Sequence, residues 1–374
     1  MEEEDFPSSE IFAQMKRVQH NPQLILEPIR RFFFHFQPQI GFPSLRLPQR
    51  LELFEMRAVE FCLKLLQTYP DHEEVCSWAW LILRDAICVF DNENPREFVT
   101  VDLALEFGVL EEIIRELERK VHRSTCLGHA FSSLTTICLV ERHALQVAQS
   151  GVARACVNVC HRQVSEELLT SALGSLKNLA MTSKCRQLLV DCGAVQVAES
   201  YVEAVASPVN STLKLGLCAC SLLVRLVGGS GWTEWLFYDR MLMLLRNVFK
   251  VGLRGTVIQS EWNPANIVLD LLLLVQCDEN QPKLVGAIPL LINGLRLRGE
   301  RNTRLVRFTV ATLFHLYVGS QSNVELAHEF QLAAESVLHE MARVGRHGAG
   351  GIDLETAQMA HALKTEMQLL VQTE

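Results

Sequence analysis

The chain has 374 residues, of which 49% are hydrophobic and 21% charged, so it is long enough to bury a large core. Its formal net charge of −8 argues against nucleic acid or an anionic membrane surface as the main partner, because both select for basic proteins. No apolar run reaches the roughly 18 residues that a membrane-spanning helix needs, so we expect no insertion into a membrane. The acidic start, Met1 to Asp5, does not resemble a secretory signal, and we expect a cytoplasmic protein, with the nucleus as the alternative location.

Residues 1–50 predict an N-terminal helical cap and a proline-containing linker. The cap contains RRFFFHF, Arg30 to Phe36, for which two interpretations are open. In the one we favour, the phenylalanines pack over the open end of the elements that follow; in the other, they form a hydrophobic hook for a partner or a membrane surface. Helical spacing places Phe32 and Phe36 on one face and Phe33 on another, so some exposure or a two-sided packing must follow.

Residues 51–320 predict about six repeated helical units. HAFSSLTTICL, residues 129–139, aligns with SALGSLKNLAM, residues 171–181, at an offset of 42, which superposes Ala130 on Ala172 and Leu134 on Leu176. Similar stretches occur upstream at residues 77–90 and downstream at residues 222–227 and 309–318. A unit over residues 239–275 matches only loosely. A period of this length is typical of helical repeat proteins.

Glycines mark the helix boundaries inside these units. Gly108, Gly151 and Gly193 recur at spacings of 43 and 42, and each follows an apolar helix end and opens another helix. Glycine at such a position ends one helix in a left-handed turn and lets the next begin almost without a loop. We expect a further glycine turn of this kind at Val285 to Leu291.

Residues 321–374 predict two amphipathic capping helices, over residues 323–345 and 352–372. The linker between them, GRHGAGG, has no Lys-Ser or Lys-Thr after its glycines, so we interpret it as a flexible connection and not as a phosphate loop.

Three stretches resemble the armadillo repeat: LLVDCGAVQVAESYVEAV, SALGSLKNLA and KLVGAIPLLINGL. The resemblance implies an all-α fold, a right-handed α-solenoid of armadillo/HEAT-like helical repeats, with HEAT repeats as the structural alternative. A single repeat of this kind cannot bury its own apolar face, so stacked repeats form one continuous core and the ends need caps.

The sequence indicates no catalytic or metal chemistry. The twelve cysteines, including Cys156-x3-Cys160 and Cys218-x-Cys220, lie within apolar helical patterns, where a free cysteine behaves as a small core residue. Neither HExxH, GxSxG, GxGxxG nor a Walker pattern occurs in the sequence. We therefore expect no enzyme activity, no metal and no cofactor.

The resemblance implies that the third helix of each unit lines a concave groove, where an asparagine bonds the backbone of an extended peptide. At that position this chain has Asp85, Thr136, Asn178, Arg225 and His315, so only Asn178 keeps the family residue. One turn earlier the residues are small or apolar (Leu81, Ser132, Gly174, Ser221 and Ala311), where nuclear-import adapters carry tryptophan, which disfavours a transport role. The candidate groove residues are Asp85, His129, Ser132, Thr136, Ser171, Lys177, Asn178, Ser221, Arg225 and His315.

We thus expect a non-catalytic scaffold or adaptor that binds another protein, whether an extended peptide, a helix or a globular domain, through its concave face. The alternative is an Hsp70-type chaperone cofactor that accelerates nucleotide exchange. A third interpretation assigns the small residues no binding role, because they also permit tight curvature.

Overall fold

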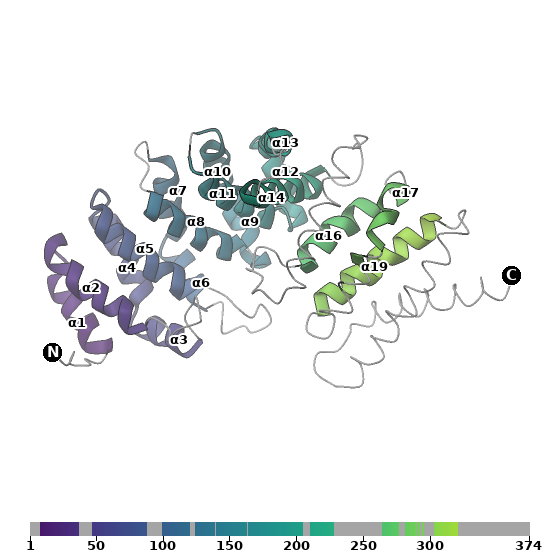
Figure 1. The fold of residues 1–374 in the computed structure, drawn as a ribbon. Coiled ribbons are helices and arrows are strands. Elements are labelled where there is room, and N and C mark those ends of the chain that lie inside the picture. The colour runs from purple at the N-terminus through teal and green to yellow at the C-terminus, as the bar shows by residue number, and fades with distance from the viewer. Residues whose placement is uncertain are drawn as a thin grey trace, which may run out of the picture. The chain divides into compact units, whose positions relative to one another are not determined.

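The computed structural model describes residues 8–36, 47–87, 99–119, 124–138, 140–162, 164–204, 210–227, 264–276, 281–288, 290, 291, 294 and 303–320. Within these ranges every regular element is a helix, as the sequence predicts (Figure 1). None of the described helices is both long enough and apolar enough to cross a membrane. The chain divides into two compact units, Met1–Tyr201 and Val202–Glu374.

The first unit repeats a three-helix motif. Its helices are α1 (Ser8–Val18), α2 (Pro22–Phe36), α3 (Leu47–Glu55), α4 (Ala58–Thr68), α5 (Glu73–Ile87), α6 (Val99–Glu106), α7 (Val109–Glu118), α8 (Ser124–Cys138), α9 (Glu141–Gln149), α10 (Val152–Cys160), α11 (Glu166–Leu179), α12 (Ser183–Asp191) and α13 (Ala194–Ala204). The first helices of the motif are α3, α6, α9 and α12, the second are α4, α7, α10 and α13, and the third are α5, α8 and α11. Equivalent helices pack on one another: α5 on α8 and α8 on α11, α4 on α7 and α7 on α10, α9 on α12 (Figure 1).

The turn between the first and second helix of each repeat is left-handed. Gly108, Gly151 and Gly193 have φ angles of 84°, 94° and 88°, which confirms the prediction for all three. The carbonyl of each then accepts the first backbone hydrogen bond of the next helix, as in Ala155 N to Gly151 O at 3.1 Å. In the first repeat Arg57 takes this position with φ 59°, and its carbonyl accepts in the same way from Phe61 N. Any residue other than glycine is strained there, because its β-carbon crowds the following carbonyl oxygen.

The aligned apolar positions of the third helices form the core. They are fully buried, and each buried leucine contributes about 1.5–3 kcal/mol relative to an exposed one. The set comprises Ala79, Leu83 and Ala86 on α5, Ala130, Leu134 and Ile137 on α8, and Ala172, Leu176 and Leu179 on α11. The repeat alignment made from sequence therefore identified the inward side of these helices correctly.

The N-terminal helices α1 and α2 have the arrangement of a second and a third helix. They begin 50 and 51 residues before α4 and α5, respectively. The helix α2 packs on α5, and the ring of Phe12 on α1 lies 5.3 Å from Phe32 and 5.2 Å from Phe61 on α4 (centroid distances). This pair therefore continues the second-helix and third-helix rows by one further step.

At α1, α7 and α10, a hydrogen bond from the next repeat completes the end of the second helix. Tyr69 Oη, after α4, donates to Gln19 O after α1 at 2.8 Å. Arg162 Nη1, after α10, donates to Leu117 O in α7 at 2.7 Å, and Tyr201 Oη in α13 donates to Cys160 O in α10, also at 2.7 Å. The last carbonyls of a helix have no partner within it, so these donors satisfy groups that otherwise depend on water.

The second unit contains α14 (Asn210–Val227), α16 (Pro264–Val275), α17 (Gln281–Leu284), the 3₁₀ helix η4 (Val285–Ala287) and α19 (Thr303–Ser320). The helix α16 packs against both α14 and α19, and the repeat position Leu313 on α19 is buried. The glycine turn predicted at Val285 to Leu291 differs from the other three: Gly286 lies within η4 and has no left-handed φ. A short 3₁₀ turn makes the connection with ordinary negative φ angles, so glycine is not required there.

Several sequence predictions fall outside the described residues. These are the linker GRHGAGG, both helices expected over residues 323–345 and 352–372, and most of the loosely matched unit over residues 239–275.

Candidate partner-binding site

The candidate residues of the first unit lie on three neighbouring third helices. Asp85 is on α5; His129, Ser132 and Thr136 are on α8; and Ser171, Lys177 and Asn178 are on α11. Because these helices pack side by side, their accessible faces form one continuous surface, called the third-helix face below.

On α8 and α11 this face carries short polar side chains. Ser132, Thr136 and Ser171 are accessible at least in part, and each hydroxyl donates to a carbonyl of its own helix, at 3.0 Å to Gly128 O, 3.2 Å to Ser132 O and 2.9 Å to Glu167 O, respectively. Each hydroxyl oxygen keeps acceptor capacity for a ligand.

Two glycines on the same surface have no side chain at all. Gly128 lies one turn before Ser132, and Gly174 lies about one turn after Ser171. A β-carbon placed on either glycine would meet no heavy atom within 4 Å. The space above both positions is therefore open, and a ligand backbone can come close to the helices there.

Asn178 lies deeper than the resemblance implies. Its side chain is only 6% exposed, and its Nδ2 donates to Thr135 O on α8 at 3.3 Å. Thr135 Oγ1 also lies 3.0 Å from Ser175 Oγ on α11. These contacts link two consecutive third helices, and the neighbouring Lys177 is buried as well.

Arg84 on α5 interacts with two of the candidate residues, Asp85 on its own helix and His129 on α8. The Asp85 carboxylate is buried and accepts from the Arg84 guanidinium, with Nε to Oδ1 at 2.7 Å. Burial raises the pKa of Asp85 despite the opposing effect of Arg84. Burial and the Arg84 charge lower the pKa of His129 to about 4. His129 is therefore neutral near pH 7, with one ring nitrogen available to donate and the other to accept.

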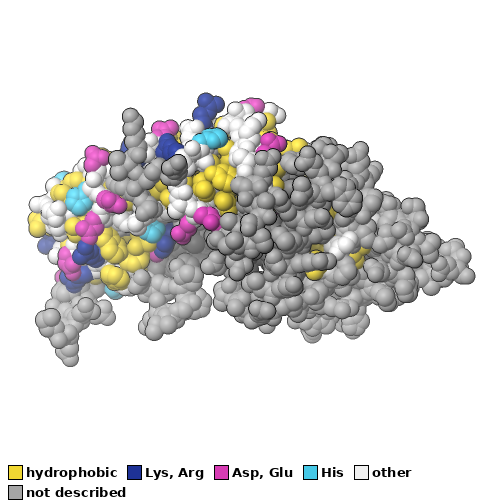
Figure 2. Space-filling view, turned by 45° about the horizontal axis from the view of Figure 1, so that its top comes forward, with side chains coloured by type: hydrophobic (Ala, Val, Ile, Leu, Met, Phe, Trp, Pro, Cys, Tyr) yellow, Lys and Arg dark blue, Asp and Glu magenta, His cyan; other side chains and the backbone are white. Residues whose placement is uncertain are grey.

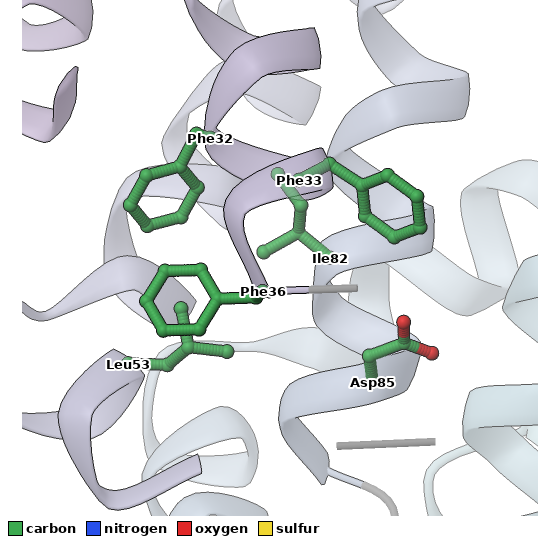
Figure 3. Close-up of a pocket in the computed structure, with 6 residues that line it drawn as sticks. All are labelled: Phe32, Phe33, Phe36, Leu53, Ile82 and Asp85. Atoms are coloured by element: carbon green, nitrogen blue, oxygen red, sulfur yellow. The ribbon is translucent and has the colours of Figure 1, made fainter. Parts of the chain in front are cut away.

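Asp85 also lines a small hollow between α2, α3 and α5. The other lining residues are apolar (Figure 3): Phe32, Phe33, Phe36, Leu53 and Ile82. The free volume is about 10 Å³. That is close to the least space that holds one water molecule, so the hollow does not admit a ligand side chain.

In the second unit, the candidate residues Ser221 and Arg225 are buried on α14, whereas His315 on α19 is partly accessible. Arg225 Nε donates to Asp270 Oδ1 on α16 at 2.7 Å, and both side chains are 1% exposed. Asp270 lies 45 residues after Arg225 and 45 before His315, so it holds the same repeat position. Sequence reasoning missed Asp270, although this equal spacing was a signal that could have identified it.

Two aromatic residues at the surface, Phe34 on α2 and Trp78 on α5, were not among the candidate groove residues, although Phe34 belongs to the RRFFFHF stretch. Phe34 is 57% exposed, and its ring lies 5.9 Å from that of Trp78 on α5 at 65°, in an edge-to-face contact. Phe32, Phe33 and Phe36 are buried. The two interpretations of RRFFFHF thus separate by residue: three phenylalanines pack inside, and Phe34 lies at the surface.

Among the residues that the structure describes, no three His, Cys, Asp or Glu side chains are placed to hold an ion. The described cysteines are free thiols, and all except Cys192 are buried. Burial raises the pKa of the Cys160 thiol to about 12 and also raises those of Cys62, Cys138 and Cys156. Such thiols stay protonated, and a protonated thiol is a poor nucleophile and a poor metal ligand.

Comparison with known proteins gives matches among solved structures only. No protein-family model matches the sequence, and no curated protein sequence matches it. One similar chain comes from a study of the phosphorylation switch that controls the interaction between cadherin and β-catenin; it is 13% identical, with 95% of this chain and 74% of that chain covered and a TM-score of 0.50. A designed armadillo repeat protein in complex with the peptide (KR)4 is 16% identical, with 72% of this chain and all of that chain covered and a TM-score of 0.49. The chain has an all-α solenoid fold of armadillo-like repeats.

Proposed function

We propose that this chain is a non-catalytic scaffold or adaptor that binds another protein along the third-helix face. The observation that carries the proposal is the low, polar surface of α8 and α11. Gly128 and Gly174 leave open space, so a ligand main chain can approach, and Ser132 and Ser171 lie beside it to accept hydrogen bonds.

The dimensions of the repeat suit an extended ligand. Packed helices lie about 10 Å apart, and an extended chain advances about 3.3 Å per residue, so each repeat would meet about three ligand residues. The match to a chain from a study of the cadherin and β-catenin interaction supports protein binding as a use of this fold.

In this proposal the candidate residues divide into two groups by accessibility. His129, Ser132, Thr136 and Ser171 contact the partner directly, and His315 is an accessible candidate within the second unit. Two of the buried residues, Asn178 and Arg225, act by holding neighbouring helices in register. The other buried candidates are Asp85, Lys177 and Ser221.

The test is Gly174→Arg, which adds a long side chain to the open surface of α11. Helical glycine tolerates replacement, so we expect the variant to fold and to lose the partners that wild-type protein captures from its native cells, as identified by mass spectrometry. Asn158→Arg, an exposed position on the second helix α10, is the matched control and should keep them. Equal capture by wild type and Gly174→Arg would overturn the proposal.

A nucleotide-exchange assay with Hsp70 separates this proposal from the chaperone-cofactor alternative. The scaffold proposal predicts that the purified chain leaves the exchange rate unchanged. Acceleration by wild-type protein would favour the cofactor instead.

A further inference from the structure

The starting observation is the surface contact between Phe34 on α2 and Trp78 on α5, called the aromatic pair below. Phe34 and Leu24 are the large hydrophobic side chains that stand out as exposed in the described part of the chain. Phe34 is held on its inner side by Phe33 and Trp78, at centroid distances of 5.6 and 5.9 Å, while Trp78 itself rests on Phe33 at 5.5 Å. Buried Phe33 thus supports both rings from below.

The aromatic pair is not needed to close the N-terminal end of the core. Phe32 and Phe36 already pack there, with their rings 5.1 Å apart, and Phe12 covers Phe32. The hollow beside them is too small to receive another ring. The exposure of Phe34 therefore has no explanation in the packing of the described core.

The charges around the aromatic pair are compensated within the chain. One turn earlier on both helices, Arg30 forms an ion pair with Glu74, which joins α2 to α5 just as the aromatic pair does. Two turns after Trp78, Arg84 pairs with Asp85 at 2.6 Å. Figure 2 shows hydrophobic side chains at the N-terminal end of the described surface, with basic and acidic side chains interspersed around them.

This electrostatic setting determines the chemistry of a suitable ligand. Because Arg30 and Glu74 neutralise each other, neither a cationic nor an anionic side chain would meet an uncompensated opposite charge beside the rings. An uncharged apolar side chain needs no such partner and gains the full area of both rings. Two preoriented rings also lose little side-chain entropy on binding, which is a property of good anchor sites.

We infer that the aromatic pair binds one large uncharged side chain (Leu, Ile, Phe or Trp) of a peptide segment in the protein partner. This inference rests on the proposed function, because α2 and α5 are third-type helices and place the pair on the third-helix face beside α8. The small polar floor holds the peptide main chain, and the aromatic pair holds its apolar anchor.

The test selects peptides from a random phage-displayed library on the immobilised full chain and compares variants. Phe34→Gln removes the outer ring; Leu24→Gln is the matched control, because Leu24 is equally exposed on the same helix without a ring contact to Trp78. We expect the selected peptides to share a large apolar residue. Phe34→Gln should weaken them at least 10-fold and Leu24→Gln less than 2-fold. Affinity should change less than 2-fold between 50 and 500 mM NaCl.

The outcomes separate this inference from the proposed function. Peptides that lose binding to Gly174→Arg but not to Phe34→Gln overturn the inference and leave the proposed function standing. Peptides insensitive to both variants, or no recovered peptide, count against both. Basic peptides with steep salt dependence also overturn the inference.

Two other occupants of the aromatic pair are checked directly. Phe34-dependent cosedimentation with phosphatidylcholine vesicles would replace the peptide with a membrane surface. A Phe34-dependent dimer in sedimentation velocity would replace it with a second copy of the chain. The inference predicts neither.

Discussion

At the scale of single residues, the buried ion pair between Arg225 and Asp270 makes the second unit sensitive to the loss of either partner. Both side chains are almost completely removed from water, and their attraction must offset the desolvation of two charges. Such pairs often contribute little net stability, yet removal of one partner is costly, because the other charge remains buried. The pair therefore fixes which residues of α14 and α16 lie opposite each other.

We expect Asp270→Ala to lower the free energy of unfolding by about 3–5 kcal/mol, because it removes the carboxylate that accepts from the buried Arg225 Nε. The double change Arg225→Met/Asp270→Leu should cost much less than the single change. Urea denaturation followed by circular dichroism measures both. The control is Glu60→Ala, which breaks the exposed pair with Arg57 and should cost less than about 1 kcal/mol. A double variant as unstable as Asp270→Ala would contradict the argument.

The sequence identified the buried apolar positions of the third helices but not the depth of each polar side chain. Asn178 and Arg225 were expected in the groove, and the structure shows both as buried. Repeat spacing assigns a residue to a side of its helix, whereas its exposure depends on how far the helix turns toward its neighbours. That rotation follows from packing of the adjacent repeats, for which one sequence carries no direct signal.

At the scale of elements, a residue with left-handed backbone conformation joins the first and second helices of each repeat in the first unit. Three repeats use glycine, and the first uses Arg57. The glycine turns could be predicted because a glycine at a helix boundary indicates a positive φ angle. Arg57 could not, because nothing in an arginine indicates a positive φ, and the strain is tolerated only in the folded context.

We expect Gly151→Ala to destabilise the protein by about 1–2 kcal/mol, because φ stays at 94° in the turn. Arg57→Gly should stabilise it by up to about 1 kcal/mol, because it removes the same strain. Gly174→Ala is the control for glycine replacement within a helix, and should stabilise by about 0.5–1 kcal/mol. Thermal melts of the three variants decide this. A loss of stability on Arg57→Gly would show that the ion pair with Glu60 outweighs the strain.

The N-terminal helices show a limit of the period search. A cap was expected there, but not that α1 and α2 would follow the second and third positions of the repeat. These helices precede their equivalents by 50 and 51 residues, a spacing that α5 also has before α8, where the sequence match was still found. The residue pattern is what differs, because Pro28 and His35 of α2 stand where α5 has Ala79 and Ala86.

At the scale of the whole molecule, the buried thiols report unfolding of each unit. We expect iodoacetamide to label Cys192 rapidly in native protein and Cys156 or Cys218 only after unfolding, because burial denies access to both. Mass spectrometry of samples labelled across a urea series gives a midpoint for Cys156 in the first unit and for Cys218 in the second. Cys156, Cys138 and Cys62 should share one midpoint, since the rows of the first unit couple its repeats. Labelling of Cys156 as fast as that of Cys192 without urea would contradict the described core.

The hydrogen bonds at the ends of the second helices have a direction. In each case the donor comes from the later repeat: Tyr69 for α1, Arg162 for α7 and Tyr201 for α10. A nascent chain leaving the ribosome therefore cannot finish the end of one second helix until about one more repeat has been synthesised. Translation speed over the donor segments thus becomes a physical variable of folding, and a pause just before Tyr69 or Arg162 would hold the preceding helix end exposed to water for longest.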